Sequence, residues 1–239
     1  MIKSFIQKLT DFIHHNARSR SKSLAQISSA ITEKKDSPFM RTEAQELLSK
    51  AQYETDHAIK EQMLLQAEEL TKSNQNAVDL HYIYIHLIEF YYRQRHTDGS
   101  ALNKCIEYCK KDIDLFPLFK KAYINEHIDQ IKYVQNFFEK DSAEYKEYER
   151  KIEAYKPTIP NIPSFKRLAI IYEKQGKYEE AIKICDLAIS NNLADDTKGG
   201  FEGRRNRILK KINQQKALSN VKGANSYGKS NSEQDTGKT

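Results

Sequence analysis

Hydrophobic residues recur every three or four positions along most of this chain, which is the spacing of one face of an α-helix. The pattern appears first in residues 2–13, where it predicts an amphipathic helix. Residues 77–95 are apolar on almost every side, so we expect the helix predicted there to be central. Further helices are predicted over about 24–31, 44–51, 58–70, 102–113, 117–138, 142–155, 164–175, 178–191 and 200–216.

Prolines and glycines are few, and their positions set the expected breaks between helices. Only Gly99 and Gly176 occur before residue 199, which disfavours a turn-dense β architecture. We expect a helix capped by Ser100 to stop before Pro117, because proline disfavours a helical conformation in the residue before it. Pro117 should then open the next helix. Residues 156–163 contain three prolines and form the clearest internal joint. The sequence therefore predicts an all-α fold.

One segment carries a more specific pattern, because residues 162–195 read as two helices of similar length joined at Gly176. The small residues Ala169 and Ala181 would let two helix backbones approach closely, while Leu168 and Tyr172 would fill the space between neighbouring pairs. The segment resembles a tetratricopeptide repeat, whose spacing is kept by Leu168, Ala169, Tyr172, Gly176, Tyr178, Ala181, Cys185 and Ala188. The resemblance is clear over this repeat and looser from Tyr82 to Pro117. A third stretch, residues 38–72, shares only the succession of two helices.

One such repeat cannot bury its own apolar face, and about three are needed for a stable stack. The resemblance therefore implies a TPR-like α-solenoid of about ten antiparallel helices, whose first helices line a concave surface. That surface would bind a peptide or helix of another protein. The inward positions that the resemblance implies are Tyr82, Ile85, Glu89, Tyr92 and Arg93 in the looser repeat, and Lys166, Ile170, Glu173 and Lys174 in the clear one.

The breaks and the repeats together divide the chain into four parts. The expected parts are an N-terminal amphipathic segment at 1–36, degenerate TPR-like hairpins at 37–156, the clear repeat with a basic capping helix at 157–216, and a tail at 217–239. The tail is rich in Gly, Ser and Asn and lacks the apolar residues needed to fold, so we expect it to be disordered.

Charge is concentrated at the two ends of the chain. The net charge is +6, but residues 1–22 and 198–216 carry +4 and +6, while residues 23–197 sum to −5. The last helix is interpreted as a polar cap of the solenoid. In an alternative interpretation, this helix binds an anion or a nucleic acid through Arg204, Arg205 and Arg207. The basic residues that follow the first helix leave attachment to a membrane surface open as well, beside docking of that helix onto the body or a partner.

No catalytic or metal-binding pattern is complete in this sequence. Cys105 and Cys109 lie four residues apart on one helix face, but no second pair completes a zinc site, so we expect them to be buried core residues. His86 and Glu89 are interpreted as an isolated pair. Residues 223–230 match the letters of a phosphate-binding loop, but no predicted strand precedes them. We therefore expect no cofactor, no metal and no enzymatic activity.

The sequence thus favours a non-catalytic protein-interaction scaffold. Three cysteines cannot all pair within the chain, and they do not form a secreted disulfide framework, so we expect the protein in the cytoplasm. The expected partner is another protein. A nucleic-acid-associated accessory protein that uses the basic ends, and a membrane-surface adaptor that uses residues 2–13, are the alternatives.

Overall fold

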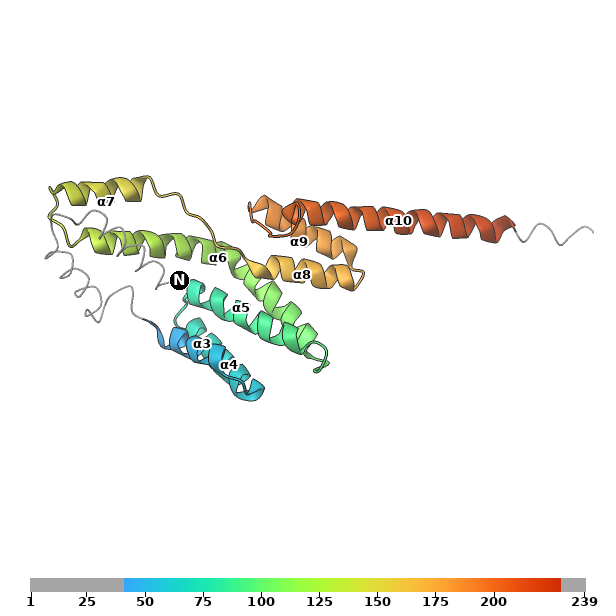
Figure 1. The fold of residues 1–239 in the computed structure, drawn as a ribbon, viewed down its shortest axis with the longest axis horizontal. Helices are drawn as coiled ribbons and strands as arrows, with labels where there is room; N and C mark the ends of the chain where they lie inside the picture. The colour runs from blue at the N-terminus through green and yellow to red at the C-terminus, as the bar shows by residue number, and fades with distance from the viewer. Residues whose placement is uncertain (1–40, 229–239) are drawn as a thin grey trace, which may run out of the picture. The chain divides into compact units, whose positions relative to one another are not determined.

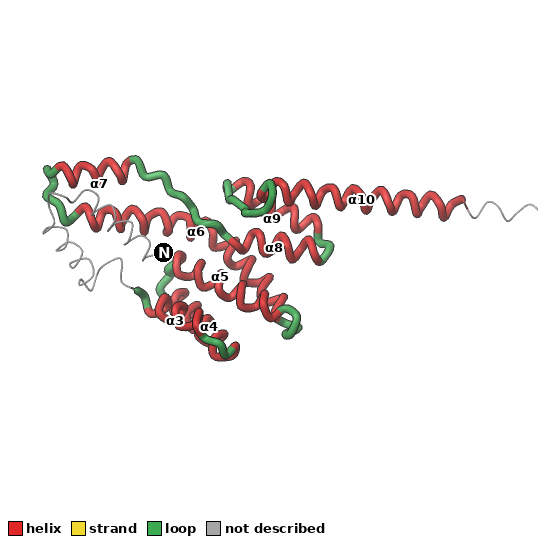
Figure 2. The backbone as a smooth tube through the Cα atoms, viewed as in Figure 1, coloured by secondary structure: helices red, strands yellow, loops and turns green. Residues whose placement is uncertain are grey.

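A computed structural model describes residues 41–228 of the chain and the side chains of residues 41–217 (Figure 1). This part of the chain contains eight α-helices and no strand, so the predicted all-α class is confirmed for it (Figure 2). The helices predicted at 2–13 and 24–31 lie outside the described residues. The helices are α3 (Glu43–Tyr53), α4 (His57–Ser73), α5 (Ala77–Gln94), α6 (Ala101–Gln135), α7 (Ala143–Glu153), α8 (Pro163–Lys174), α9 (Tyr178–Ser190) and α10 (Gly200–Gly228).

Local sequence accounts for several helix ends. The side chains of Thr42, Asp56 and Ser142 accept backbone N–H groups of the first turns of α3, α4 and α7, which satisfies donors that have no partner inside a helix. Pro163 is the first residue of α8, a position where the missing N–H is not needed. Gly176 has a φ of 73° in the tight turn between α8 and α9, a conformation that glycine adopts without strain.

The helix break predicted at Pro117 is wrong, because α6 runs without interruption through that residue. A proline inside a helix removes one backbone hydrogen bond and costs about 3 kcal/mol. The two aromatic side chains beside it, Phe116 and Phe119, are 2% and 0% exposed, and burying such rings contributes about as much as the proline costs. Burial on both sides of Pro117 therefore offsets the local preference to end the helix.

The last helix is longer than its apolar residues predict. The expected end was residue 216, and α10 continues to Gly228. No proline follows residue 163, so every residue of α10 has a backbone N–H that can donate a helical hydrogen bond. Extending an existing helix adds one hydrogen bond for each residue fixed, whereas starting a helix is the costly step. The packed start of α10, where Phe201 and Ile208 are buried, supplies that first step.

The described residues group into two compact units, each of which combines two separate stretches of chain. The first unit contains α3, α4, the start of α5 up to Ile83, the part of α6 from Leu115, and α7. Helices α3 and α4 pack as a hairpin, and the buried side chains Ala44, Ala51 and Ala67 allow their close approach.

Polar and aromatic contacts complete the first unit. Asp79 is buried and accepts hydrogen bonds from the side chains of Thr42, Gln45 and Asn76, at 2.9, 2.6 and 3.0 Å. Farther along the unit, Phe138 beyond α6 stacks on Tyr148 of α7, with ring centroids 5.5 Å apart. These contacts tie the start of α5 to α3, and α7 to the end of α6.

The second unit contains the rest of α5 and α6, up to Asp114, together with α8, α9 and α10. Helix α9 packs against both α8 and α10. Small side chains again lie at the helix contacts, and Ala169, Ala181, Cys185 and Ala188 are all 0% exposed. This unit carries most of the residues for which a role in binding is predicted.

Candidate partner-binding surface

Eight of the nine residues predicted to line a binding surface fall in the second unit, and Tyr82 falls in the first. Ile85, Glu89, Tyr92 and Arg93 are spaced by four, three and one residues, which places them on one face of α5. Their exposure fits this placement, since Arg93 is exposed and the other three are partly buried. Tyr82 is partly buried too, and burial raises the pKa of its hydroxyl.

A single arginine joins this face of α5 to α8. Arg167 donates to Glu89 Oε2 at 3.1 Å, and its guanidinium lies 3.8 Å from the centre of the Tyr92 ring. The other carboxylate oxygen of Glu89 accepts from Arg93 at 2.8 Å. Arg167 is absent from the sequence prediction, although it lies three residues before Ile170 and therefore on the same face of α8.

A second guanidinium stacks on the same ring. Arg95, just beyond the end of α5, lies 4.0 Å from the centre of the Tyr92 ring and donates to the Tyr92 carbonyl at 2.6 Å. Cations over an aromatic face are attracted by the ring quadrupole, and arginine adds stacking of its planar group. Tyr92 is therefore held in place by two arginines.

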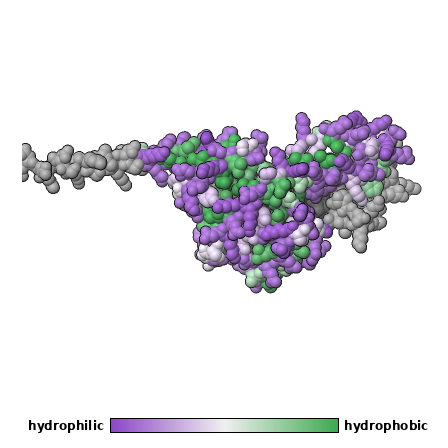
Figure 3. All heavy atoms as spheres, turned by 180° about the vertical axis from the view of Figure 1, so that it is seen from behind, coloured by the Kyte–Doolittle hydropathy of each residue, from purple (hydrophilic) through white to green (hydrophobic). Residues whose placement is uncertain are grey.

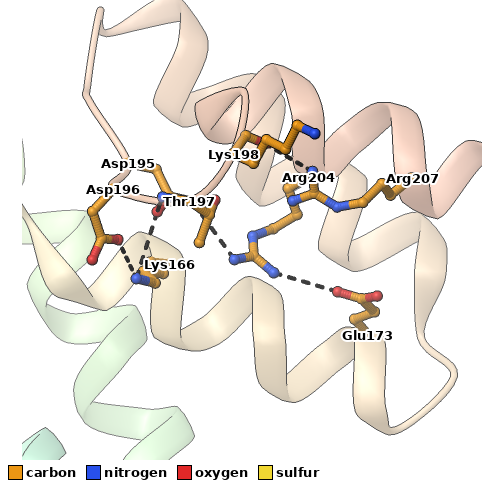
Figure 4. A network of polar contacts seen from close by, with 8 residues as sticks. All are labelled: Lys166, Glu173, Asp195, Asp196, Thr197, Lys198, Arg204 and Arg207. Atoms are coloured by element: carbon orange, nitrogen blue, oxygen red, sulfur yellow. Dashed lines mark hydrogen bonds and ion pairs between the residues drawn. The ribbon is translucent and has the colours of Figure 1, made fainter.

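Two of the predicted residues already have strong partners inside the unit (Figure 4). Lys166 forms ion pairs with Asp195, at 3.6 Å, and with Asp196, both in the loop between α9 and α10. The hydrogen bond from Lys166 lowers the pKa of Asp196. Glu173 forms ion pairs with Arg204 at 3.4 Å and with Lys211 at 2.5 Å.

The contacts of Arg204 are the most deeply buried of this network. Its side chain is 8% exposed, and besides Glu173 it reaches the fully buried carboxylate of Asp195 at 3.6 Å. Asp195 also accepts from the backbone N–H and the hydroxyl of Thr197, which shapes the loop (Figure 4). The network thus fastens α10 and the preceding loop onto α8.

The arginines considered for nucleic-acid contact all have partners within the second unit. Arg205 pairs with Asp186 at 2.6 Å, and Arg207 donates to the Lys198 carbonyl at 2.8 Å. Because Arg204 is buried in the network, replacing all three arginines together would damage the fold as well as any anion site. A test of that alternative needs exposed cations such as Lys210.

Two residues of α8 stay open to a ligand, one between the contacts of Arg167 and Glu173 and one just after Glu173. Ile170 is partly buried and Lys174 is exposed, and among the described residues Lys174 has no ion-pair partner. Together with Ile85, Glu89, Tyr92, Arg93, Arg95 and Arg167 they form a surface that we call the α5–α8 face. Its side chains are apolar, aromatic or charged, and most of the charged ones are cationic.

The cysteines are buried and free, as the sequence predicts. Burial raises the pKa of Cys185 to about 11. A hydrogen bond between the other two thiols lowers the pKa of Cys105 and raises that of Cys109. Residues 41–228 contain no group of three or more His, Cys, Asp or Glu side chains arranged to hold a metal ion.

Glycine at position 203 is required by the close passage of the loop before α10. A methyl group there would lie 2.6 Å from the Lys198 carbonyl oxygen and 3.2 Å from the Arg207 guanidinium. Alanine is normally better than glycine inside a helix by about 1 kcal/mol. Here we expect Gly203→Ala to lower the free energy of unfolding by about 1–3 kcal/mol, measured by urea denaturation.

Gly99→Ala is the control for this substitution, since nothing lies within 4 Å of the added methyl group. We expect it to change the free energy of unfolding by less than about 0.5 kcal/mol. A Gly203→Ala protein that is more stable than the parent would contradict the close approach.

The visible surface is mainly hydrophilic, with hydrophobic side chains in separate patches (Figure 3). None of the helices between residues 41 and 228 has an apolar stretch long enough to cross a bilayer. Comparison with known proteins finds no family model, no curated protein and no solved structure that matches this chain.

Proposed function

We propose that this chain is a non-catalytic interaction scaffold of the tetratricopeptide type, which binds a peptide or helix of another protein on the α5–α8 face. The observation that carries the proposal is the order in which helices are linked. Arg167 connects α8 to α5, and Glu173 connects α8 to α10. In a solenoid of helix pairs, the first helix of each pair lies beside the first helix of the next, and α5, α8 and α10 hold those positions.

Packing within the second unit supports the same interpretation. Leu168 and Tyr172, which would fill the space between pairs, are 1% and 9% exposed. Phe165, at the position where the repeat often has tryptophan, is 1% exposed. The large side chains are thus buried on one side of α8, while the other side carries the open residues Ile170 and Lys174.

The chemistry of the α5–α8 face suits recognition better than catalysis. Apolar and aromatic side chains lie next to arginines, a composition enriched where proteins bind one another. The three free cysteines are buried and support a place in a reducing compartment, which we propose is the cytoplasm.

Position-specific crosslinking tests the proposal. A photoreactive amino acid placed at Arg93 or at Lys174, both exposed, should yield a crosslink to the same partner protein, because both positions lie on the α5–α8 face. The matched control places the same group at Lys183, an exposed position on α9. The crosslinked products are identified by mass spectrometry.

The pattern of crosslinks shows whether a partner binds at all and whether it binds on the α5–α8 face. Crosslinks from Arg93 and Lys174 to one protein, with none from Lys183, would support the scaffold. Equal crosslinks from all three positions, or none from any, would contradict binding on the α5–α8 face.

A further inference from the structure

We propose that the α5–α8 face takes an acidic segment of its partner, whose side-chain carboxylates bind Arg95, Arg167 and Lys174. This inference rests on the proposed function and names the chemistry of the ligand. It follows from the charges that stay uncompensated on the face and from the geometry in which the two arginines are held.

The face carries more positive than negative charge. Arg93 and Arg167 share one carboxylate, that of Glu89, whose two oxygens they occupy, and Arg95 adds a third guanidinium beside Tyr92. Lys174 adds a further exposed cation on α8. The face is therefore left with three cations in excess of its own carboxylate.

The nearest other acid on α8 does not cancel this excess. Glu173 is engaged by Arg204 and Lys211, which together carry more positive charge than Glu173 carries negative. Lys166 is likewise matched by Asp195 and Asp196 and does not contribute. The charge that remains open to a ligand is thus that of Arg95 and Lys174, together with the excess of Arg93 and Arg167 over Glu89.

Tyr92 presents two guanidinium groups in a fixed arrangement. Both lie within 4.0 Å of the ring centre, and two planar groups cannot occupy the same side at that distance, so they lie on opposite faces of the ring. Stacked in this way, each group keeps N–H donors in its plane that can bind a carboxylate in a two-pronged manner. The separation of the two groups is at most about 8 Å.

That separation matches an extended acidic peptide. Side chains two residues apart in an extended chain lie on the same side, roughly 7 Å from one another. Two acidic residues separated by one residue could therefore reach Arg95 and Arg167 together. Ile170 offers an apolar contact between these arginines and Lys174 for one hydrophobic side chain of the same peptide.

Two other occupants fit the face less well. Single-stranded nucleic acids bind through bases stacked on open aromatic rings, and both faces of Tyr92 are covered. The chain's own residues 1–22 carry a net charge of +4 and would be repelled by the same cations. An acidic segment of another protein is the occupant that the charges favour.

Fluorescence polarisation with a defined peptide tests this inference. The probe is a short peptide in which glutamates alternate with neutral residues around a central leucine, with both ends blocked so that only side-chain carboxylates are present. We expect it to bind the full chain with an affinity that falls as salt is added. The matching peptide with glutamine in place of glutamate should bind at least about tenfold more weakly.

The double variant Arg95→Gln, Lys174→Gln should bind the glutamate peptide at least about tenfold more weakly than the parent. The matched control is Lys183→Gln, Lys210→Gln, which removes the same charge from exposed positions off the face and should bind as the parent does. Circular dichroism and thermal melting of both variants show whether each keeps the parent fold. The single variant Lys174→Glu, which changes only an exposed position, should also lose the peptide.

Several outcomes would overturn the inference. These are no binding of the glutamate peptide at low salt, equal loss in the two double variants, or tighter binding of oligo(dT) that depends on Arg95 and Lys174. If Arg93 and Lys174 positions crosslink a partner while the glutamate peptide does not bind, the acidic class is wrong and the scaffold proposal stands.

Discussion

Replacing Arg204 with methionine is expected to lower the free energy of unfolding by about 3–5 kcal/mol, measured by urea denaturation followed by circular dichroism. The substitution keeps an apolar chain of similar length but removes the charge that Asp195 and Glu173 face. The side chain of Asp195 is 0% exposed, so its carboxylate would stay buried without this cation. Losing one partner of a buried pair costs far more than losing one partner at the surface.

The adjacent residue supplies the control. Arg205 pairs with Asp186, but the two side chains are 41% and 49% exposed, so Arg205→Met should cost less than about 1 kcal/mol. The combined variant Arg204→Met, Asp195→Asn should lose less stability than Arg204→Met alone, because the buried carboxylate that faced the guanidinium is then replaced by a neutral amide. Equal effects of the Arg204 and Arg205 substitutions would show that burial of the network does not matter.

Replacing Phe165 with alanine is expected to lower the free energy of unfolding by about 3–5 kcal/mol as well, measured in the same way. The ring is 1% exposed on the buried side of α8. Its loss removes apolar contact area and leaves a cavity that a close-packed interior refills only in part.

Leu187→Ala is the matched apolar truncation, because Leu187 is 42% exposed on α9. We expect it to cost less than about 1 kcal/mol. A Phe165→Ala protein as stable as the Leu187→Ala protein would mean that Phe165 is not a centre of packing.

Periodicity predicted the helices because each buries one face, and that information is local. The buried faces of α8 and α9, with Leu168, Ala169 and Ala181, follow from spacing alone. Pro117 was misinterpreted since its local preference to end a helix is overcome by burial of Phe116 and Phe119, which depends on side chains far away in the sequence. The end of α10 was placed too early because propagation of a started helix needs no apolar residues.

Prediction of the binding surface was limited in the same way, because the sequence pattern does not show contacts between residues far apart in the chain. The resemblance implied that Lys166 and Glu173 line the concave surface, but their partners Asp196 and Lys211 lie 30 and 38 residues further along the chain. No rule that compares positions three or four apart can find such pairs. Arg167 carried a local signal, its spacing to Ile170, and could have been included on that basis.

The interleaving of the two units bears on how the protein can be dissected. Residues 84–114 group with residues 159–239, whereas residues 115–158 between them group with the N-terminal stretch. A fragment cut at the proline-rich joint would keep α8, α9 and α10 but lose Glu89, Tyr92 and the rest of α5. Truncation cannot isolate either half intact, so mapping of a binding partner on this chain has to proceed by point substitutions in the whole protein.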